Sequence, residues 1–109
     1  MALNKESNLE IMSVFKECLP IFSVLNDENR QKIILILSEF PEGIIVNDIT
    51  GRLNLSRPAV SHHLKVLKGA GIVDNVNKGV ESYYFLTLKR AVENLKKLTS
   101  SIEKKCTLR

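Results

Sequence analysis

The fold is decided by residues 49–72, whose sequence is ITGRLNLSRPAVSHHLKVLKGAGI. The pattern predicts two short helices, about Asp48–Leu53 and a second that begins after Ser56, joined by a tight turn. Ser56 is a favoured N-cap residue, and Pro58 falls in the first turn of the second helix, where its missing N–H is not needed. Asn54 tolerates the left-handed conformation that a sharp turn requires. We therefore predict a compact helix-turn-helix unit.

The second helix of this unit has two distinct faces. Val60, Leu64 and Leu67 are spaced i, i+4 and i+7, which predicts the buried face. The opposite face is small, polar or basic and carries no carboxylate; it consists of Arg57, Pro58, Ala59, Ser61, His62 and Lys65. Such a face favours entry into a DNA major groove, because small residues let the backbone approach and basic donors reach guanine or phosphate oxygens.

Individual roles follow from position along this helix. Its first residues, beginning with Ser56, are expected nearest the DNA, so Arg57 and Ser61 are predicted to read base edges. The phosphate contacts are predicted for His62, His63, Lys65 and Lys68. The alternative is an ordinary amphipathic helical hairpin with a solvated polar face.

The residues before this unit predict two helices and a short strand. A first helix over residues 7–25 has apolar residues at helical spacing, and Pro20 is expected to kink or divide it; those apolar residues are Leu9, Met12, Phe15, Cys18, Leu19 and Phe22. A second helix is predicted over Asp27–Phe40, capped by Asn26 or Asp27. Ile44–Val46 follows as a minimal strand, and Asn47 is expected to cap the next helix.

The residues after Gly69 and Gly71, which end the helix, predict a β-hairpin and a last helix. Strands over Ile72–Val76 and Val80–Leu86 flank a turn in which Gly79 takes a positive φ. Lys78 stands at the tip, where a basic residue suits the minor groove or its phosphates. The last helix, Leu88–Lys105, repeats apolar residues at a three-four alternation, which suits packing against a symmetry mate.

The resulting order is helix, helix, short strand, helix, helix, strand, strand, helix. A helix-turn-helix followed by a β-hairpin is a winged helix-turn-helix, here a mainly α (α+β) fold. With 109 residues the chain is long enough for one domain, so residues 1–109 are predicted to form a single DNA-binding domain.

Charge is distributed unevenly along the chain. Residues 1–50 hold 4 Lys and Arg against 8 Asp and Glu, whereas residues 51–109 hold 12 against 4. The first half therefore has a net charge of −4 and the second half +8, which sum to the overall +4. A basic half beside an acidic half is typical of a nucleic-acid-binding protein.

Several classes of protein are not expected. No stretch approaches the ~18 apolar residues of a membrane span, and residues 1–6 lack the basic-then-apolar order of a signal peptide. Two cysteines make no disulfide framework. There is no nucleophile–base–acid set, Gly-rich phosphate loop or metal cluster. We therefore expect a cytoplasmic protein without a membrane partner that is not an enzyme.

The helix-turn-helix stretch closely resembles the ArsR family of bacterial and archaeal repressors. The resemblance covers Leu25–Leu86 and is most specific at Ser61–Leu67, Ser-His-His-Leu-Lys-Val-Leu. It implies a homodimer formed by the first and last helices, which places two recognition helices on a palindromic double-stranded DNA operator. It also implies a repressor whose DNA affinity falls when an inducer binds.

The chain departs from the family in its metal ligands. Many members sense metal through Cys-x-Cys on the third helix, where this chain has Ile45-Val46-Asn47-Asp48. Other members use His and carboxylate ligands on the last helix, where this chain has no His and only Glu93 and Glu103 as acids. Soft and borderline ions need thiolate or imidazole ligands. No metal site and no cofactor are therefore expected.

The two cysteines do not determine which effector, if any, the protein senses. Cys18 lies late in the first helix and Cys106 just past the last, so helix packing within or across a dimer decides whether the thiols are close enough for redox sensing. The alternatives are a core cysteine with an ordinary tail thiol, a small organic effector in the dimer cleft, or no effector.

Two functions from different classes remain. The leading interpretation is a homodimeric, sequence-specific DNA-binding transcriptional regulator, by resemblance a repressor. The second is a winged-helix protein-interaction module that does not bind DNA. The basic, acid-free face around Arg57 and Lys65 argues for the first, because a protein-binding module has no need of it.

Overall fold

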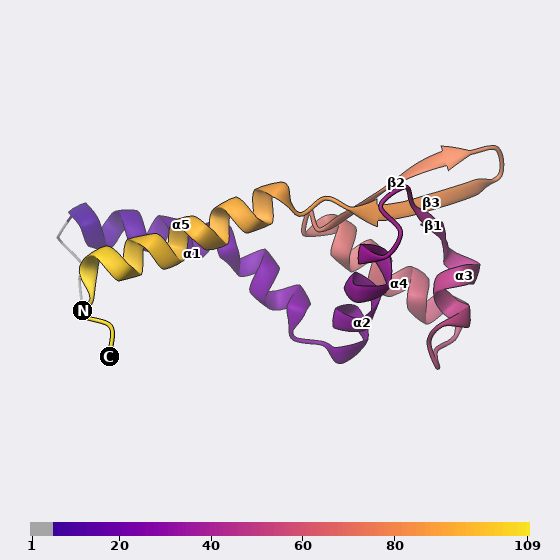
Figure 1. Ribbon diagram of the computed structural model, residues 1–109, viewed down its shortest axis with the longest axis horizontal. Coiled ribbons are helices and arrows are strands. Elements are labelled where there is room, and N and C mark those ends of the chain that lie inside the picture. The colour runs from indigo at the N-terminus through magenta and orange to yellow at the C-terminus, as the bar shows by residue number, and fades with distance from the viewer. Residues whose placement is uncertain (1–5) are drawn as a thin grey trace.

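A computed structural model of the chain describes residues 6–109. Most of the segment 1–6, on which the signal-peptide prediction depends, lies outside the described residues. The elements follow the predicted order and form a winged helix-turn-helix (Figure 1). The helices are α1 (Glu6–Leu25), α2 (Glu28–Ser38), α3 (Val46–Gly51), α4 (Arg57–Gly69) and α5 (Lys89–Lys105); the strands are β1 (Ile44–Ile45), β2 (Val73–Lys78) and β3 (Glu81–Leu86).

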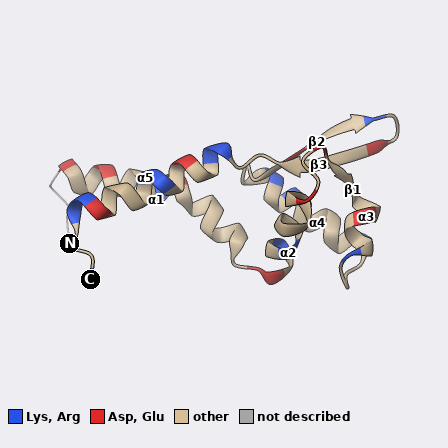
Figure 2. Cartoon of the chain, in the orientation of Figure 1, with Lys and Arg blue, Asp and Glu red and all other residues tan. Residues whose placement is uncertain are grey.

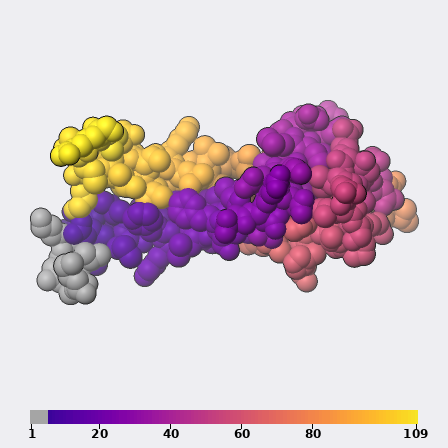
Figure 3. All heavy atoms as spheres, turned by 90° about the horizontal axis from the view of Figure 1, so that it is seen from below, coloured from indigo at the N-terminus to yellow at the C-terminus, as the bar shows by residue number. Residues whose placement is uncertain are grey.

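The molecule is elongated, with principal extents of 53 × 26 × 25 Å. Its two ends differ in architecture (Figures 1 and 3). One end is an antiparallel pair of helices, α1 and α5. The other end packs α2, α3 and α4 together with the sheet, and we call it the reading unit.

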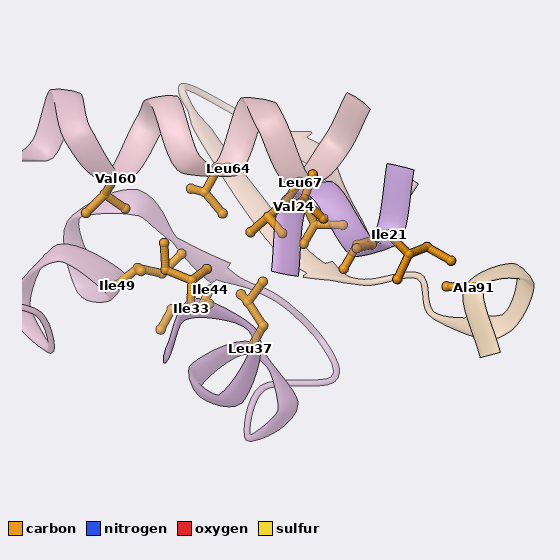
Figure 4. Close-up of a cluster of buried hydrophobic side chains, with 12 residues drawn as sticks. Ile21, Val24, Ile33, Leu37, Ile44, Ile49, Val60, Leu64, Leu67 and Ala91 are labelled. Atoms are coloured by element: carbon orange, nitrogen blue, oxygen red, sulfur yellow. The ribbon is translucent and has the colours of Figure 1, made fainter. Parts of the chain in front are cut away.

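The core of the reading unit forms around α4. Val60, Leu64 and Leu67 are fully buried, which confirms the buried face predicted from their spacing. They point toward the side chains of α2 and of the β1–α3 segment, and the last turns of α1 close one side of this core (Figure 4). Burial of this one face leaves the opposite face of α4 in solvent.

A three-stranded antiparallel sheet of order β1-β3-β2 carries the wing. β1 pairs only with Tyr83 and Tyr84 of β3, so the outer half of the β2–β3 hairpin is two-stranded. Gly79 has φ +64° at the hairpin turn, which confirms its predicted role. Gly43, before β1, has φ +106°, and a Cβ there would lie 2.9 Å from the Cβ of Tyr83, so this close approach to β3 requires glycine.

Helix α1 differs from the prediction in two ways. It continues as one helix through Pro20, so of the two expected effects, a kink or a division, the division is wrong. Burial on both sides of the proline, at Cys18 and Ile21, holds the turns together, while Pro20 itself is exposed. Of the predicted apolar residues only Cys18 is buried. The inner face is made by Val14, Cys18, Ile21 and Val24, and the remainder stay exposed: Leu9, Met12, Phe15, Leu19 and Phe22.

Local boundaries near the turn unit also differ. Val46 opens α3 instead of ending β1, and the helix has no side-chain cap, so the predicted cap by Asn47 is wrong. No non-glycine residue among residues 6–109 has positive φ, so Asn54 does not take the predicted left-handed conformation. In α2 the cap is Asp27, as predicted, but the helix ends at Ser38. β2 extends to Lys78, because cross-strand pairing continues to Glu81.

Candidate nucleic-acid interface

Helix α4 is fixed at its start by local chemistry. The Ser56 hydroxyl accepts the backbone N–H of Ala59 at 3.3 Å, which is the predicted N-cap bond. Pro58 occupies the first turn, where its ring sets φ and no hydrogen-bond donor is lost. Leu53 and Leu55 from the preceding turn pack against the core. The start of α4 is therefore rigidly attached while its outer face is free.

The outer face of α4 carries a basic stripe. Arg57, Ser61, Lys65 and Lys68 follow one another at i, i+4, i+8 and i+11, and all four are exposed. His62 is exposed beside them, as is Pro58, while Ala59 is half-buried. α4 contains no Asp or Glu along its whole length. The structure thus gathers most of the predicted contact residues on one accessible face.

His63 is the exception among these residues. Its side chain is half-buried, and its Nδ1 is excluded from solvent without a hydrogen-bond partner among the described residues. Adjacent residues diverge on a helix, and the two imidazole rings are 6.2 Å apart and tilted by 53°. His63 lies on the side of α4 that faces Asp27 at the start of α2. His62, not His63, therefore faces outward with the stripe.

The N-cap of α2 is a charged residue that lies where α2 meets the end of α1. The Asp27 carboxylate accepts the backbone N–H of Arg30 at 3.1 Å and lies 4.0 Å from its guanidinium. The backbone hydrogen bond, followed by the charge of Arg30, holds the pKa of Asp27 below its ordinary value of 3.8. Arg30 Nε in turn donates to the Val24 carbonyl at 2.6 Å, which ties α2 to the end of α1.

A hollow of 310 Å³ separates α4 from the wing. Arg57 and Ser61 line it from the helix, and Ser82 and Tyr84 line it from β3. Asn47 lines it at the start of α3, beside Ile45 and Val46, and Val80 and Glu81 line it at the wing turn, so the lining includes one carboxylate. The sequence did not mark Asn47 or Ser82 as candidates, because only the sheet register brings them beside the recognition helix. A strand of phosphodiester backbone can lie in such a hollow between helix and wing.

The wing tip carries one basic residue. Lys78 and Glu81 face each other across the turn, at the far end of the hairpin (Figure 2). The ammonium of Lys78 lies 5.1 Å from the centre of the Tyr83 ring, and a cation–π contact holds it there. Tyr84, the neighbour of Tyr83, packs against the core instead. The two adjacent tyrosines therefore have different roles, because neighbouring side chains of a strand lie on opposite faces of the sheet.

The two cysteines lie at different levels of the α1–α5 pair. Cys18 is fully buried against Leu98, whereas Cys106 is exposed beside Asn8 and Ile11. Ten residues of helix separate the level of Asn8 from Cys18, or about 15 Å at the α-helical rise. A disulfide needs Cα atoms within about 7 Å. Both thiols are free, and the structure does not bring them together within one chain.

The described part of the chain contains neither a cluster of metal ligands nor a helix that could span a membrane. No three His, Cys, Asp or Glu side chains among residues 6–109 are grouped so as to hold a metal ion. The segment at which family members carry Cys-x-Cys, Ile45–Asp48, lacks a thiol, so the residues do not fit that metal site. None of the described helices has the length and apolar character needed to cross a membrane.

Comparison with known proteins identifies the family. Residues 27–75 match the model of the bacterial regulatory protein arsR family. The transcriptional repressor SdpR of Bacillus subtilis is 35% identical over 66 residues, which are 61% of this chain and 71% of SdpR. The chain belongs to the ArsR family of transcriptional regulators.

Solved structures agree with this family assignment. The ArsR-like transcriptional regulator from Rhodococcus sp. RHA1 is 27% identical, has a TM-score of 0.66 and covers 85% of this chain and 82% of its own. A possible ArsR-family regulator from Mycobacterium bovis is described as a homodimeric winged helix-turn-helix DNA-binding domain. That protein is 16% identical, has a TM-score of 0.63 and covers 100% of this chain and 98% of its own. At this identity it supports the fold alone.

Proposed function

We propose that this ArsR-family protein is a homodimeric repressor that binds a palindromic DNA operator through α4 and the wing. The observation that carries the proposal is the exposed, acid-free stripe of Arg57, Ser61 and Lys65 beside the hollow under the wing. A helix with this face fits the major groove, and the hollow accepts the adjoining phosphodiester backbone. Repression is proposed from the similarity to SdpR.

The dimer is proposed from the exposed apolar face of α1. Leu9, Met12, Phe15, Leu19 and Phe22 are all more than a third exposed, with Leu19 at 55%. Met12 and Phe15 also line an apolar hollow of 390 Å³ against Ile102 of α5. A second copy on this face would bury these side chains and set two α4 helices on one side of the DNA. Operator half-sites would then lie about 34 Å apart, one helical turn.

The contact residues divide into two classes. Arg57 and Ser61, near the start of α4, are proposed to contact base edges, and an arginine bidentate to guanine carries most of the discrimination. His62 and Lys65 are proposed to contact phosphates, together with Lys78 on the wing. The Ser56 hydroxyl caps α4 and thereby positions Arg57. Phosphate contacts make affinity fall with salt without depending on sequence.

The test begins with selection of duplexes from a random pool, followed by fluorescence anisotropy titrations at several salt concentrations. We expect an enriched inverted repeat. Arg57→Ala should weaken binding by about 1–3 kcal/mol and relax the preference at one base pair of each half-site. Lys65→Ala should weaken binding to all sequences alike and lower the salt slope by about 2, which is about 0.9 for each copy in the dimer.

Lys96→Ala is the matched control, because Lys96 is an exposed lysine on α5, away from α4 and the wing. It removes the same charge and should leave the selected sequence unchanged. If no sequence is enriched, and neither Arg57→Ala nor Lys65→Ala changes binding more than Lys96→Ala does, the DNA-binding proposal fails. The protein-interaction module would then be the better account.

A further inference from the structure

Lys68 belongs to the basic stripe by sequence but is engaged elsewhere in the structure. It lies in the last turn of α4, eleven residues after Arg57, where spacing predicts a phosphate contact. Its Nζ instead donates to Oδ1 of Asn75 at 2.7 Å and lies 3.7 Å from Oδ1 of Asp74. Both partners are on β2. Lys68 therefore connects the end of the recognition helix to the wing.

The connection continues along the wing. Asn75 Nδ2 donates to Oδ1 of Asn77 at 3.4 Å, and Ser82 Oγ donates to the same oxygen at 2.5 Å. Asn75 and Asn77 share one face of β2, because side chains alternate along a strand, and Asn77 is directly opposite Ser82 in the sheet. One row of polar side chains thus runs from the end of α4 to β3 near the wing tip.

The outer wing has few other restraints. In β2 only Val73 is buried, and the residues from Asn77 outward are exposed. β1 stops at the level of Tyr83, so the outer hairpin is two-stranded, and an isolated two-stranded hairpin is marginally stable. Its base is fixed, since Thr87 Oγ1 donates to the Gly71 carbonyl at 3.1 Å. The direction of the wing beyond that base depends on the polar row.

Charge also separates Lys68 from the rest of the stripe. The Asp74 carboxylate beside it neutralises the ammonium and would repel a DNA phosphate at the same place. Within residues 6–109, Arg57 and Lys65 form no ion pair with a carboxylate, whereas Lys68 does. A phosphate contact by Lys68 would compete with its hydrogen bond to Asn75 and its ion pair with Asp74.

We propose that Lys68 is a positioning residue, which holds the wing at a fixed angle to the recognition helix through Asp74 and Asn75. This inference rests on the proposed function for its effect on DNA binding. With the wing held in place, Lys78 and Ser82 reach the DNA backbone together with Arg57. Without Lys68, the wing must be ordered upon binding, and that loss of entropy weakens the complex.

The first test uses Lys68→Met and Asn75→Ala in salt-dependent anisotropy titrations with the selected duplex. Both variants should bind about three- to tenfold more weakly with the wild-type salt slope. Lys68→Arg, which keeps a donor for both partners, should restore most of the affinity. A salt slope lowered by about 2 in Lys68→Met, with wild-type affinity in Asn75→Ala, would identify Lys68 as a phosphate contact and overturn the proposal.

Lys32→Met is the matched control. Lys32 pairs with Glu28 on α2 at 3.6 Å, its side chain is 54% exposed against 52% for Lys68, and it lies outside α4 and the wing. It should leave affinity near the wild-type value. An equal loss of affinity in Lys32→Met and Lys68→Met would reduce the effect to net charge and overturn the proposal.

A second measurement separates this inference from the proposed function, because it uses the protein without DNA. Backbone NMR order parameters of residues 76–81 should fall in Lys68→Met and in Asn75→Ala but not in Lys32→Met. Unchanged order parameters in the first two variants would overturn the positioning role, whatever the DNA titrations show. Lower order parameters in a protein that binds no duplex would support the positioning role and reject only the proposed function.

Discussion

The two ends of the molecule are built from similar amounts of helix but differ in how completely they bury it. In the reading unit the three core side chains of α4 touch α2, β1 and α3, and apolar residues from β2, β3 and the end of α1 close the cluster. The separate cluster between α1 and α5 has only three buried side chains, Val14, Cys18 and Leu98, and Leu95 and Ile102 cover them in part. The reading unit is complete in one chain, whereas the helical pair leaves an apolar face uncovered.

The difference teaches that the two ends have different sources of stability. Buried apolar area stabilises the reading unit within one chain, at about 25 cal/mol for each Å² removed from water. The α1–α5 pair has only a small buried cluster of its own, and its exposed apolar face would be stabilised by the second copy proposed above. Substitutions in the core of the reading unit should therefore mainly lower the free energy of unfolding, whereas substitutions on the exposed face of α1 should mainly weaken the dimer.

The largest effect is expected in the reading unit. Leu64→Ala removes a fully buried side chain from the middle of α4 and leaves a cavity, which should lower the free energy of unfolding by about 2–5 kcal/mol. Urea denaturation at fixed protein concentration measures this. Leu35→Ala, at a position that is 67% exposed, is the control and should change stability by under about 0.5 kcal/mol. If Leu64→Ala and Leu35→Ala lowered the free energy of unfolding equally, the burial of Leu64 in a closed core would be contradicted.

A smaller effect on stability, but a large one on assembly, is expected on α1. Leu19→Glu places a charge in the apolar face and should raise the dimer dissociation constant about 100-fold while helix content is retained. Sedimentation equilibrium and circular dichroism measure the two quantities. Ser13→Glu adds the same charge to an exposed position outside that face and should leave the dimer intact. A Leu19→Glu protein that dimerises like the wild type would place the interface elsewhere.

The smallest effect is expected at the junction of the two regions, where Asp27 caps α2. Its pKa in the folded protein is below 3.8, so its carboxylate stabilises the fold above that pH, and this contribution is lost as the pH falls through the folded-state pKa. Asp27→Asn keeps the cap oxygen but removes the charge. The urea midpoint of the variant should lie below that of the wild type at neutral pH, and the gap should close on acidification. A gap that persists in acid would contradict this account.

Local rules predicted much of the reading unit. The Ser56 cap, Pro58 in the first turn of α4 and the buried spacing of Val60, Leu64 and Leu67 all depend on neighbours within one or two helical turns. The positive φ of Gly79 is likewise a property of the hairpin turn. The exposed stripe followed from the same helical period, because a buried face determines the face opposite to it.

Predictions that depended on distant contacts were less successful. Asn47 was predicted to be a cap, but α3 directly follows the β1 residues that pair with β3 and starts two residues earlier than a cap at Asn47 would require. Pro20 was expected to kink or divide α1, and the division does not occur, because side chains on both sides of it are buried. His63 was predicted to contact phosphate together with His62, but its ring is half-buried and its Nδ1 is excluded from solvent.

The sequence by itself determined the order of the elements, the buried face of the recognition helix and the basic character of its outer face, because helical periodicity, caps and turn residues act over a few neighbouring positions. Only the tertiary structure decided which apolar residues of α1 stay uncovered, that Cys18 and Cys106 lie apart, and that Lys68 bonds to the wing. These outcomes depend on which segments, distant in sequence, pack side by side. The spacing of residues along the chain does not reveal which of these segments become neighbours in space.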